Sequence, residues 1–235
     1  MIIFHIDVNN AFLSWESVYR LREEGETLDL RTVAAVIGGS EKTRHGIVLA
    51  KNQLAKEAGV KTGDVLWQAK KKCPDIVQLP ADFSAYLRVS KEVRKIYERY
   101  TDCVEAFGID ECWLDVTHSS LFGSGAEIAE KIRKQVKDTY GLTVSVGVSF
   151  NKIFAKLASD LKKPDAVTAV GREDYKQKIW PLPVSDFPEH CSFYSGKPRN
   201  NIFKLPSVWL NAKHLVIFPQ PKGKGVNMEM LPFRT

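Results

Sequence analysis

The sequence predicts an α+β fold in which helices cover one face of a mixed or antiparallel sheet. Two observations support this class. Apolar, β-prone runs at residues 2–7, 103–116 and 142–150 are separated by long segments of helical period. The second run is long enough for a hairpin, so the strands do not simply alternate with helices as they do in a parallel sheet. The 235 residues, 44% of them hydrophobic, suffice for one good core or two small ones.

The first third of the chain predicts a buried strand, a helix and a small strand-containing segment. Residues 2–7 form the strand, and Phe12, Trp15 and Tyr19 follow at helical spacing. A polar, glycine-rich stretch then separates two further β-prone runs, and Pro74 ends the last helical segment. The expected elements are a helix at 10–23, strands at 33–37 and 47–50, and short helices at 53–58 and 65–72.

The middle of the chain predicts two long helices on either side of the hairpin. Asp82 is a good N-cap for the first. Ser124, with Glu127 three residues later, forms a capping box for the second. The other expected elements are the hairpin at 103–116, a strand at 142–150, and a helix that is capped by Asn151 and ends before Pro164.

The character of the chain changes after Asp186. Residues 187–235 hold six of the eleven prolines and show no long helical or strand period. They carry seven Lys/Arg against two Asp/Glu, whereas the first 186 residues carry 27 against 26. The net charge of +6 therefore belongs mostly to this basic, proline-rich tail, and it is weak support for a DNA-binding core.

Several protein classes are excluded by the sequence. No run approaches the roughly 20 apolar residues of a membrane span, and the N-terminus lacks the features of a signal peptide, so we expect a cytoplasmic protein without membrane contact. The four cysteines form no C-x-x-C pair, which argues against a zinc site and a disulfide framework.

Three of the carboxylates in these apolar runs are candidates for a site. Asp7 ends the first run, and Asp110 and Glu111 are neighbours inside the hairpin. Strand neighbours point to opposite faces, so this pair shares a site only near the hairpin tip; the alternative is an exposed acidic turn. Carboxylates in such surroundings need a positive partner, and a pair of divalent metals is the usual one for three of them. Because two metals drive displacement at phosphorus, the pattern predicts a metal-dependent nucleotidyl transferase.

Lysines and one aromatic residue are further candidates. Lys152 and Lys156 share a face of the helix after residue 151, where they suit a phosphate or form a solvated stripe. Lys51 and Lys56 form either a second phosphate clamp or a charged surface loop. Phe12 suits contact with a nucleotide sugar, although base rates favour an ordinary core position.

Four segments occur in a familiar order. They are residues 6–16 (IDVNNAFLSWE), 55–63 (AKEAGVKTG), 109–111 (IDE) and 147–164 (GVSFNKIFAKLASDLKKP). With them, residues 1–186 resemble the catalytic half of Y-family (UmuC-type, DNA polymerase IV-like) translesion DNA polymerases. The resemblance implies a palm at 1–10 and 75–165, a small inserted fingers subdomain at 11–74, and the start of a thumb at 166–186.

The resemblance also implies a mechanism and site residues. Asp7, Asp110 and Glu111, with the Val8 carbonyl, would hold two Mg²⁺ ions, for which Mn²⁺ can substitute. Phe12 matches the steric gate that rejects the ribose 2′-hydroxyl, and Lys156 matches a palm lysine that contacts the triphosphate. The implied substrates are a dNTP and a primed DNA template, in the cytoplasm at the nucleoid. A sliding clamp is a further partner in the full-length family, but no clamp-binding motif is found here.

Two departures from the family pattern stand out. Gln53 and Lys56 occupy the fingers positions where the family presents a Tyr and an Arg to the phosphates, and Lys lacks the bidentate fork of Arg. After residue 186 neither thumb nor little finger is recognisable, and the tail suggests a truncated or frameshifted gene.

Two alternatives to an active polymerase follow. One is a truncated, non-catalytic or very weakly active remnant that folds but cannot hold DNA, because a nearly neutral core offers few phosphate contacts. The other is a two-metal nuclease or nucleotide cyclase on a similar palm, which the lysine helix and Phe12 disfavour.

Overall fold

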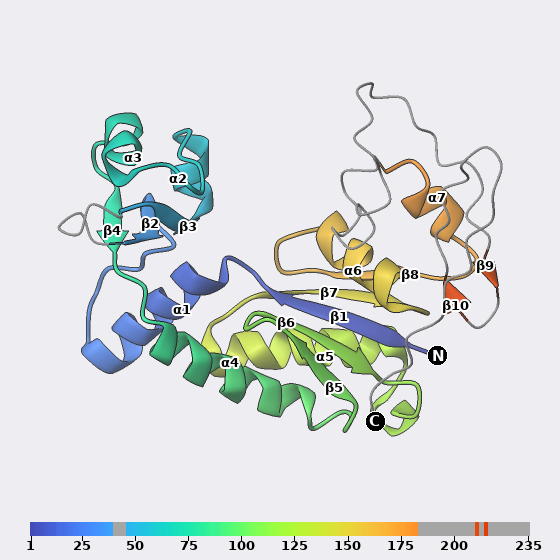
Figure 1. Ribbon diagram of the computed structural model, residues 1–235. Helices are drawn as coiled ribbons and strands as arrows, with labels where there is room; N and C mark the ends of the chain where they lie inside the picture. Colours follow the sequence, from blue (N-terminus) through green and yellow to red (C-terminus); the bar gives the residue numbers. More distant parts are fainter. Residues whose placement is uncertain (40–45, 183–209, 212–213, 216–235) are drawn as a thin grey trace. The chain divides into compact units, whose positions relative to one another are not determined.

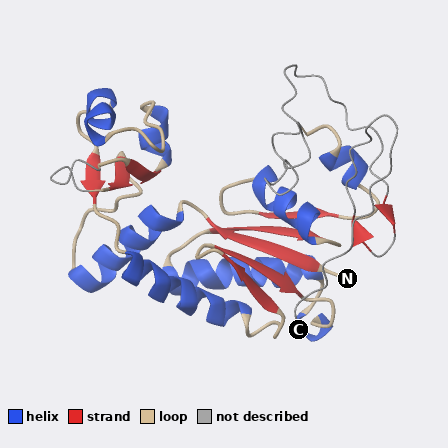
Figure 2. Ribbon diagram, in the orientation of Figure 1, coloured by secondary structure: helices blue, strands red, loops and turns tan. Residues whose placement is uncertain are grey.

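The computed structural model describes residues 1–39, 46–182, 210–211 and 214–215 (Figure 1). By their internal contacts the residues form two units, Met1–Ala169 and Val170–Thr235. Strands and helices are interspersed through the first unit, as Figure 2 shows. Within the described part of the chain, none of the helices combines the length and apolar character needed to cross a bilayer.

A five-stranded sheet in the order β5-β6-β1-β7-β8 forms the centre of the first unit. Its strands are β1 (Ile3–Val8), β5 (Val104–Phe107), β6 (Glu111–Asp115), β7 (Val144–Ser149) and β8 (Val167–Val170). β1 lies in the middle, antiparallel to both β6 and β7, and all six of its residues are buried. The predicted strand, hairpin and third strand are confirmed, and with them the α+β class.

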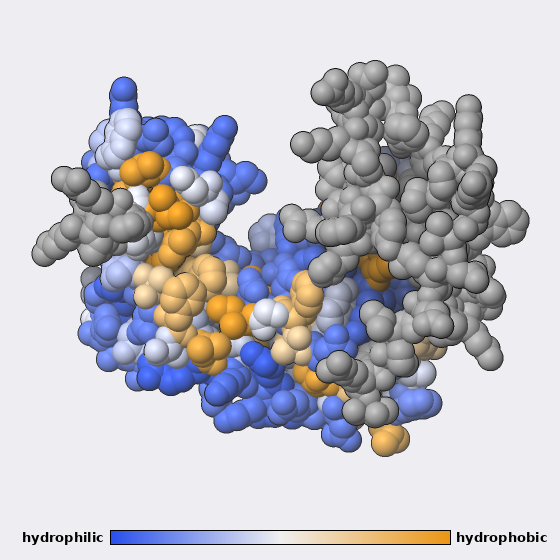
Figure 3. All heavy atoms as spheres, in the orientation of Figure 1, coloured by the Kyte–Doolittle hydropathy of each residue, from blue (hydrophilic) through white to orange (hydrophobic). Residues whose placement is uncertain are grey.

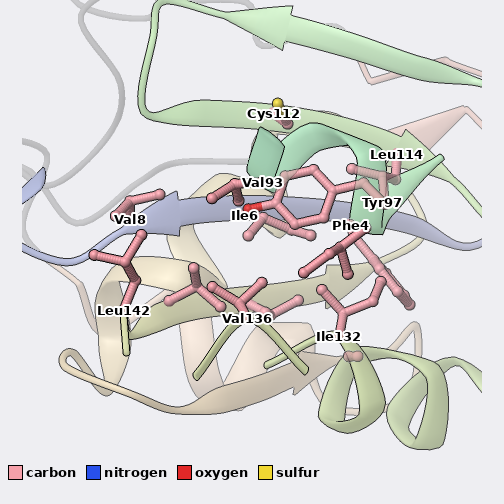
Figure 4. Close-up of a cluster of buried hydrophobic side chains, with 14 of the residues drawn as sticks. Phe4, Ile6, Val8, Val93, Tyr97, Cys112, Leu114, Ile132, Val136 and Leu142 are labelled. Carbon is pink, nitrogen blue, oxygen red and sulfur yellow. The ribbon is translucent and has the colours of Figure 1, made fainter. Parts of the chain in front are cut away.

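Two long helices cover one face of this sheet. α4 (Phe83–Tyr97) is capped by the Asp82 side chain, and α5 (Gly125–Tyr140) begins with the Ser124–Glu127 capping box. Both predicted caps are therefore present. The helices pack on the alternate residues Phe4, Ile6 and Val8 of β1 (Figure 4), because side chains two apart in a strand share a face.

The prediction that helices lie on one face needs a correction. α6 (Lys152–Leu161), capped by Asn151 as predicted, packs on β7 and β1 from the side opposite α4 and α5 (Figure 1). Gly147 explains the close packing, since a Cβ there would lie 1.8 Å from the Ala155 carbonyl oxygen. The helix-period signal gave no indication of which face the helix would cover.

A three-stranded sheet in the order β3-β2-β4 forms the other part of the first unit. Its strands are β2 (Ala35–Gly38), β3 (Val48–Lys51) and β4 (Val77–Leu79), and it carries the short helices α2 (Gln53–Glu57) and α3 (Leu66–Lys72). β4 pairs parallel to β2. It was not predicted, because a strand of only three residues, close behind a proline, is too short to show a β-strand period.

Helix α1 (Ala11–Tyr19) joins the two sheets and continues as a π-helical turn, Arg20–Glu24. Trp15 packs into the core with β1, whereas Leu13 packs with Leu30, Ala35 and Ile37 of the other part. A short 3₁₀ turn, η3 (Ser120–Phe122), precedes α5.

The described residues of the second unit are few. They form α7 (Tyr175–Ile179) and an antiparallel pair of two-residue strands, β9 (Leu210–Asn211) and β10 (His214–Leu215). The other residues of the predicted tail at 187–235 lie outside the described residues.

Candidate functional site

The acidic turn lies at the end of the β5–β6 hairpin, as the sequence predicts. Phe107 and Glu111 are the last pair of the hairpin, so residues 108–110 form its loop. Gly108 has a φ of 76°, a conformation that glycine adopts without steric cost. Asp110 therefore lies in the loop, while Glu111 begins β6. Because Asp110 is outside the strand, the two neighbouring side chains need not point to opposite faces of the sheet.

Asp7 lies across from this turn on the neighbouring strand. In the register of β1 and β6 Asp7 pairs with Glu111, and paired residues on antiparallel strands have Cβ atoms about 5 Å apart. The Val8 amide donates a hydrogen bond of 3.0 Å to the Asp110 carbonyl oxygen. The three predicted carboxylates thus come from the same end of the sheet.

A side chain of helix α4 holds the acidic loop through a hydrogen bond. The buried Ser90 hydroxyl donates to the Ile109 carbonyl oxygen at 2.5 Å, and Arg94 donates to the Ser90 hydroxyl at 2.8 Å. Sequence reasoning missed this support. A serine on the buried face of an apolar helix was the available signal, but nothing in the sequence says which carbonyl it meets.

Two lysines, one on α6 and one just after it, neutralise the carboxylates. Lys156 on α6 forms an ion pair with Glu111, and its Nζ lies 3.9 Å from Asp7 Oδ2. Lys163 pairs with Asp7 and also contacts Asp160 at 2.6 Å. Lys156 was predicted at this site. Lys163 lies in the matched 147–164 segment but was given no role, because it follows the helix and its position depends on how the chain turns there.

A buried histidine links this charge cluster to α6. His5 has no exposed surface, and its Nδ1 lies 2.8 Å from the Ser159 hydroxyl oxygen. Ser159 donates its only hydroxyl hydrogen to the Lys156 carbonyl oxygen, so Nδ1 carries the hydrogen and donates to Ser159. The other ring nitrogen, Nε2, faces Glu111 Oε2 at 3.4 Å. His5 was not predicted as a site residue.

Burial and the lysines shift the titration of these groups in different directions. Burial raises the pKa of the Asp7 carboxyl against the attraction of Lys163, and burial also raises the pKa of Asp110. Burial acts in the same sense on Glu111, but its ion pair with Lys156 holds the pKa of that carboxyl below its usual value. Burial lowers the pKa of the His5 imidazole. Glu111 is therefore the firmly ionised member of the group.

A pocket of about 290 Å³ opens beside these carboxylates, near the lower end of the size range for ligand sites. Asp7, Val8 and Asp110 line it from one side and Phe12 from α1, while Lys51 and Thr62 line it from the part of the chain around the three-stranded sheet. Lys51 Nζ donates to the Thr62 hydroxyl at 3.0 Å. Asp7 belongs both to the pocket and to the lysine cluster.

The remaining predicted residues lie at different places. Lys152 reaches Glu105 at 2.6 Å and lies over the Trp113 ring, so it points toward β5 and β6. Gln53 and Lys56 are exposed on α2, and neither lines the pocket. On the face drawn in Figure 3, apolar surface extends from this part of the unit toward α4. Leu49 and Phe83 are exposed apolar side chains of the unit.

The donor chemistry fits a hard divalent cation. Carboxylate and carbonyl oxygens are the ligands that Mg²⁺ takes, and Asp7, Asp110 and Val8 line one pocket. Among residues 1–39 and 46–182, however, no three His, Cys, Asp or Glu side chains are grouped closely enough to form a metal site, and Glu111 is directed to Lys156. The composition and common location of the donors therefore fit, while their side-chain arrangement is that of a lysine-neutralised cluster.

This architecture matches the palm and fingers of DNA polymerases. The chain superimposes on the crystal structure of DinB from Sulfolobus solfataricus with a TM-score of 0.70 and 27% identity, covering 80% of this chain and 53% of that one. An insertion ternary complex of Dbh DNA polymerase gives a TM-score of 0.70 at 28% identity, over 80% and 54% of the two chains. The predicted Y-family resemblance and fold are confirmed.

The chain belongs to the impB/mucB/samB family, whose sequence profile matches residues 6–160. DNA polymerase IV of Acetivibrio thermocellus is 53% identical over 184 residues, which are 78% of this chain and 44% of the relative. DNA polymerase IV of Clostridium acetobutylicum is 45% identical over 185 residues, or 79% and 46%. The chain spans a little under half the length of these curated relatives.

Proposed function

We propose that this chain carries the catalytic core of a translesion DNA polymerase of the polymerase IV type, which transfers a nucleotide from a dNTP to a primer 3′-hydroxyl. The observation that carries the proposal is the convergence of Asp7, Asp110 and Phe12 on one pocket, at the end of a sheet shared with this family. The relatives are named as polymerases, which favours this function over a nuclease, a cyclase or a non-catalytic remnant.

The carboxylates are proposed as the metal-binding residues. Asp7, Asp110 and Glu111, with the Val8 carbonyl, would hold two Mg²⁺ ions, whose chemistry is to activate the primer hydroxyl and to neutralise the charge of the triphosphate. Family members depend on divalent metals, and Mn²⁺ is a further candidate. Glu111, with its low pKa, supplies a fixed negative charge at neutral pH.

The basic residues and Phe12 are proposed to hold the nucleotide. Lys156 and Lys163 border the carboxylates, and Lys51 lines the pocket, so these three suit the phosphates. Phe12 would lie against the sugar. Lys152, Gln53 and Lys56 lie away from the pocket lining, and a role for them in nucleotide binding requires contact with a longer substrate than the pocket contains.

The domain assignment completes the proposal. Residues 1–10 and 75–165 correspond to a palm, 11–74 to fingers, and 166–186 to the start of a thumb. The proposed partners are a dNTP and a primed DNA template, and for the complete family protein a sliding clamp. The proposed location is the cytoplasm, at the nucleoid.

Primer extension tests this function. Wild-type protein is incubated with a primed template, the four dNTPs and Mg²⁺ at low salt, beside Asp110→Ala. We expect extension by the wild type and its loss in Asp110→Ala. Asp138→Ala, an exposed change on α5, is the matched control and should extend like the wild type. Equal extension by all three proteins would show that the assigned carboxylates do not carry the chemistry.

A further inference from the structure

A buried carboxylate lies behind the aromatic wall of the pocket. Glu16 on α1 is only 5% exposed. Its Oε2 accepts a hydrogen bond of 2.8 Å from the Tyr86 hydroxyl, and its Oε1 accepts one of 2.7 Å from Arg20 Nε. Burying a carboxylate costs free energy unless it is paired. Glu16 therefore holds both the Tyr86 hydroxyl and the Arg20 side chain in place.

Tyr86 connects this carboxylate to Phe12. Its side chain comes from α4 and is almost fully buried, and its ring lies 5.2 Å from the Phe12 ring, centroid to centroid, at a tilt of 37°. Phe12 and Glu16 are four residues apart on α1 and share a face of that helix. Tyr86 therefore spans the two, with its ring against Phe12 and its hydroxyl on Glu16.

Phe12 packs against both core clusters, and Tyr86 is the ring that lies nearest to it. Its other ring neighbours are Trp15 at 6.0 Å and Phe83 at 5.9 Å, both edge-on, and Phe83 is half exposed. Tyr86 is thus the buried ring nearest to Phe12. Burial and the hydrogen bond to Glu16 raise the pKa of Tyr86, so its hydroxyl stays a neutral donor at physiological pH.

We propose that Glu16 and Tyr86 are positioning residues for Phe12, and that they set how closely the sugar of a bound nucleotide approaches that ring. The inference rests on the proposed function. A ring that excludes a single hydroxyl group must not yield by even a few tenths of an ångström, and interior packing provides such stiffness only where the supporting side chain is itself fixed. The hydrogen bond to Glu16 fixes Tyr86 at its far end.

The test is the discrimination between dCTP and CTP, measured both as equilibrium binding and as incorporation opposite a template G. We expect Phe12→Ala to lower the discrimination about 100-fold, and Tyr86→Phe, which removes only the hydroxyl, to lower it about tenfold while dCTP use stays near that of the wild type. Glu16→Gln keeps an oxygen acceptor for Tyr86 and should retain the wild-type discrimination between dCTP and CTP. Tyr100→Phe removes a comparable hydroxyl, bonded to Gln135 at 3.1 Å and remote from Phe12, and should change nothing.

The outcomes separate the inference from the function on which it rests. If Tyr86→Phe discriminates like Tyr100→Phe, or loses dCTP and CTP equally, the positioning role is wrong. If Tyr86→Phe does not fold, Glu16→Leu carries the same test, because it removes the anchor while Arg20 keeps its ion pair with Glu26. A wild-type protein that binds and incorporates neither nucleotide overturns the proposed function, and a Phe12→Ala variant with unchanged discrimination overturns the role of the ring; either result ends this inference too.

Discussion

The two faces of β1 are made by alternate residues of one six-residue strand, yet they have opposite characters. Phe4, Ile6 and Val8 face α4 and α5 in the main core, whereas His5 and Asp7 face α6 among lysines and carboxylates. Both faces are buried. The difference lies in what each face meets. The first meets the apolar sides of α4 and α5, and the second meets paired charges around Asp7, with Ile3 packed against Trp113 and Ala155 at its other end.

The comparison shows how a catalytic-type charge cluster is tolerated in the middle of a sheet. The apolar face supplies the stability, and the polar face contributes little net free energy, because burying charges costs about as much as their pairing returns. Substitutions on the apolar face should therefore act on stability, whereas those on the polar face should cost less stability and should also disturb the site.

The largest effect should come from the apolar face itself. Phe4→Ala removes a fully buried ring that packs against α4 and α5, and we expect it to lower the free energy of unfolding by about 3–5 kcal/mol. Urea unfolding followed by tryptophan fluorescence measures this. Phe4→Leu is the control and should lose less than about 1.5 kcal/mol. A loss below about 1 kcal/mol in Phe4→Ala would mean that this face is not the stabilising one.

The contact of α6 with the polar face should be nearly as sensitive. Gly147→Ala places a methyl group against the Ala155 backbone, so α6 must move away from the sheet, and we expect a loss of about 1–3 kcal/mol. Because Lys156 is on α6, primer extension should fall as well. A variant with unchanged stability and unchanged extension would show that the helix does not pack this closely.

Local sequence patterns predicted most elements around β1 because their signals are local. Asp82, Ser124 and Asn151 each cap the helix that they were expected to cap. The loop of the β5–β6 hairpin lies at the acidic pair, as predicted. The face covered by α6 was not predictable in this way. It depends on Gly147 lying opposite Ala155, a pairing of positions that the sequence does not link.

The candidate site was only partly predictable for the same reason. Asp7, Asp110 and Lys156 carry signals of their own, as charges within or beside apolar elements. Ser90 and His5 act through tertiary contacts with Ile109 and Ser159, and no sequence pattern announces such contacts. The weakly indicated Lys51, at the end of β3, lines the pocket, whereas Lys56 on α2 is exposed.

The polar face offers a smaller, pairwise effect. His5→Ala leaves the Ser159 hydroxyl oxygen without its donor and opens a void beside Glu111, and we expect a loss of about 1–3 kcal/mol. Ser159→Ala should lose less. In the double variant the two losses should not add, and the coupling should be about 0.5–3 kcal/mol. Additive losses, measured by urea unfolding, would show that the two side chains do not interact.

The smallest effect should come from the connection between the helices of the two faces. Asp165, in the loop after α6, accepts hydrogen bonds of 2.6 Å from both Arg133 and Lys137 of α5. Burial acts to raise its pKa, but these two bonds lower it below the usual value. The stabilisation is therefore complete above the unfolded-state pKa of about 3.9 and is lost as the pH falls through the lower folded-state pKa. After solvent screening it should amount to about 0.5 kcal/mol.

This acid dependence is measured by urea unfolding from pH 6 to pH 2, with Asp165→Asn as the comparison. The variant keeps the shape of the side chain but cannot ionise, so its free energy of unfolding should fall less steeply than that of the wild type below about pH 4. Parallel curves would show that α5 holds this loop without help from the charge of Asp165. The two faces of β1 would then be joined by the chain and the sheet alone, and the separation of stability from site chemistry would be sharper than we propose.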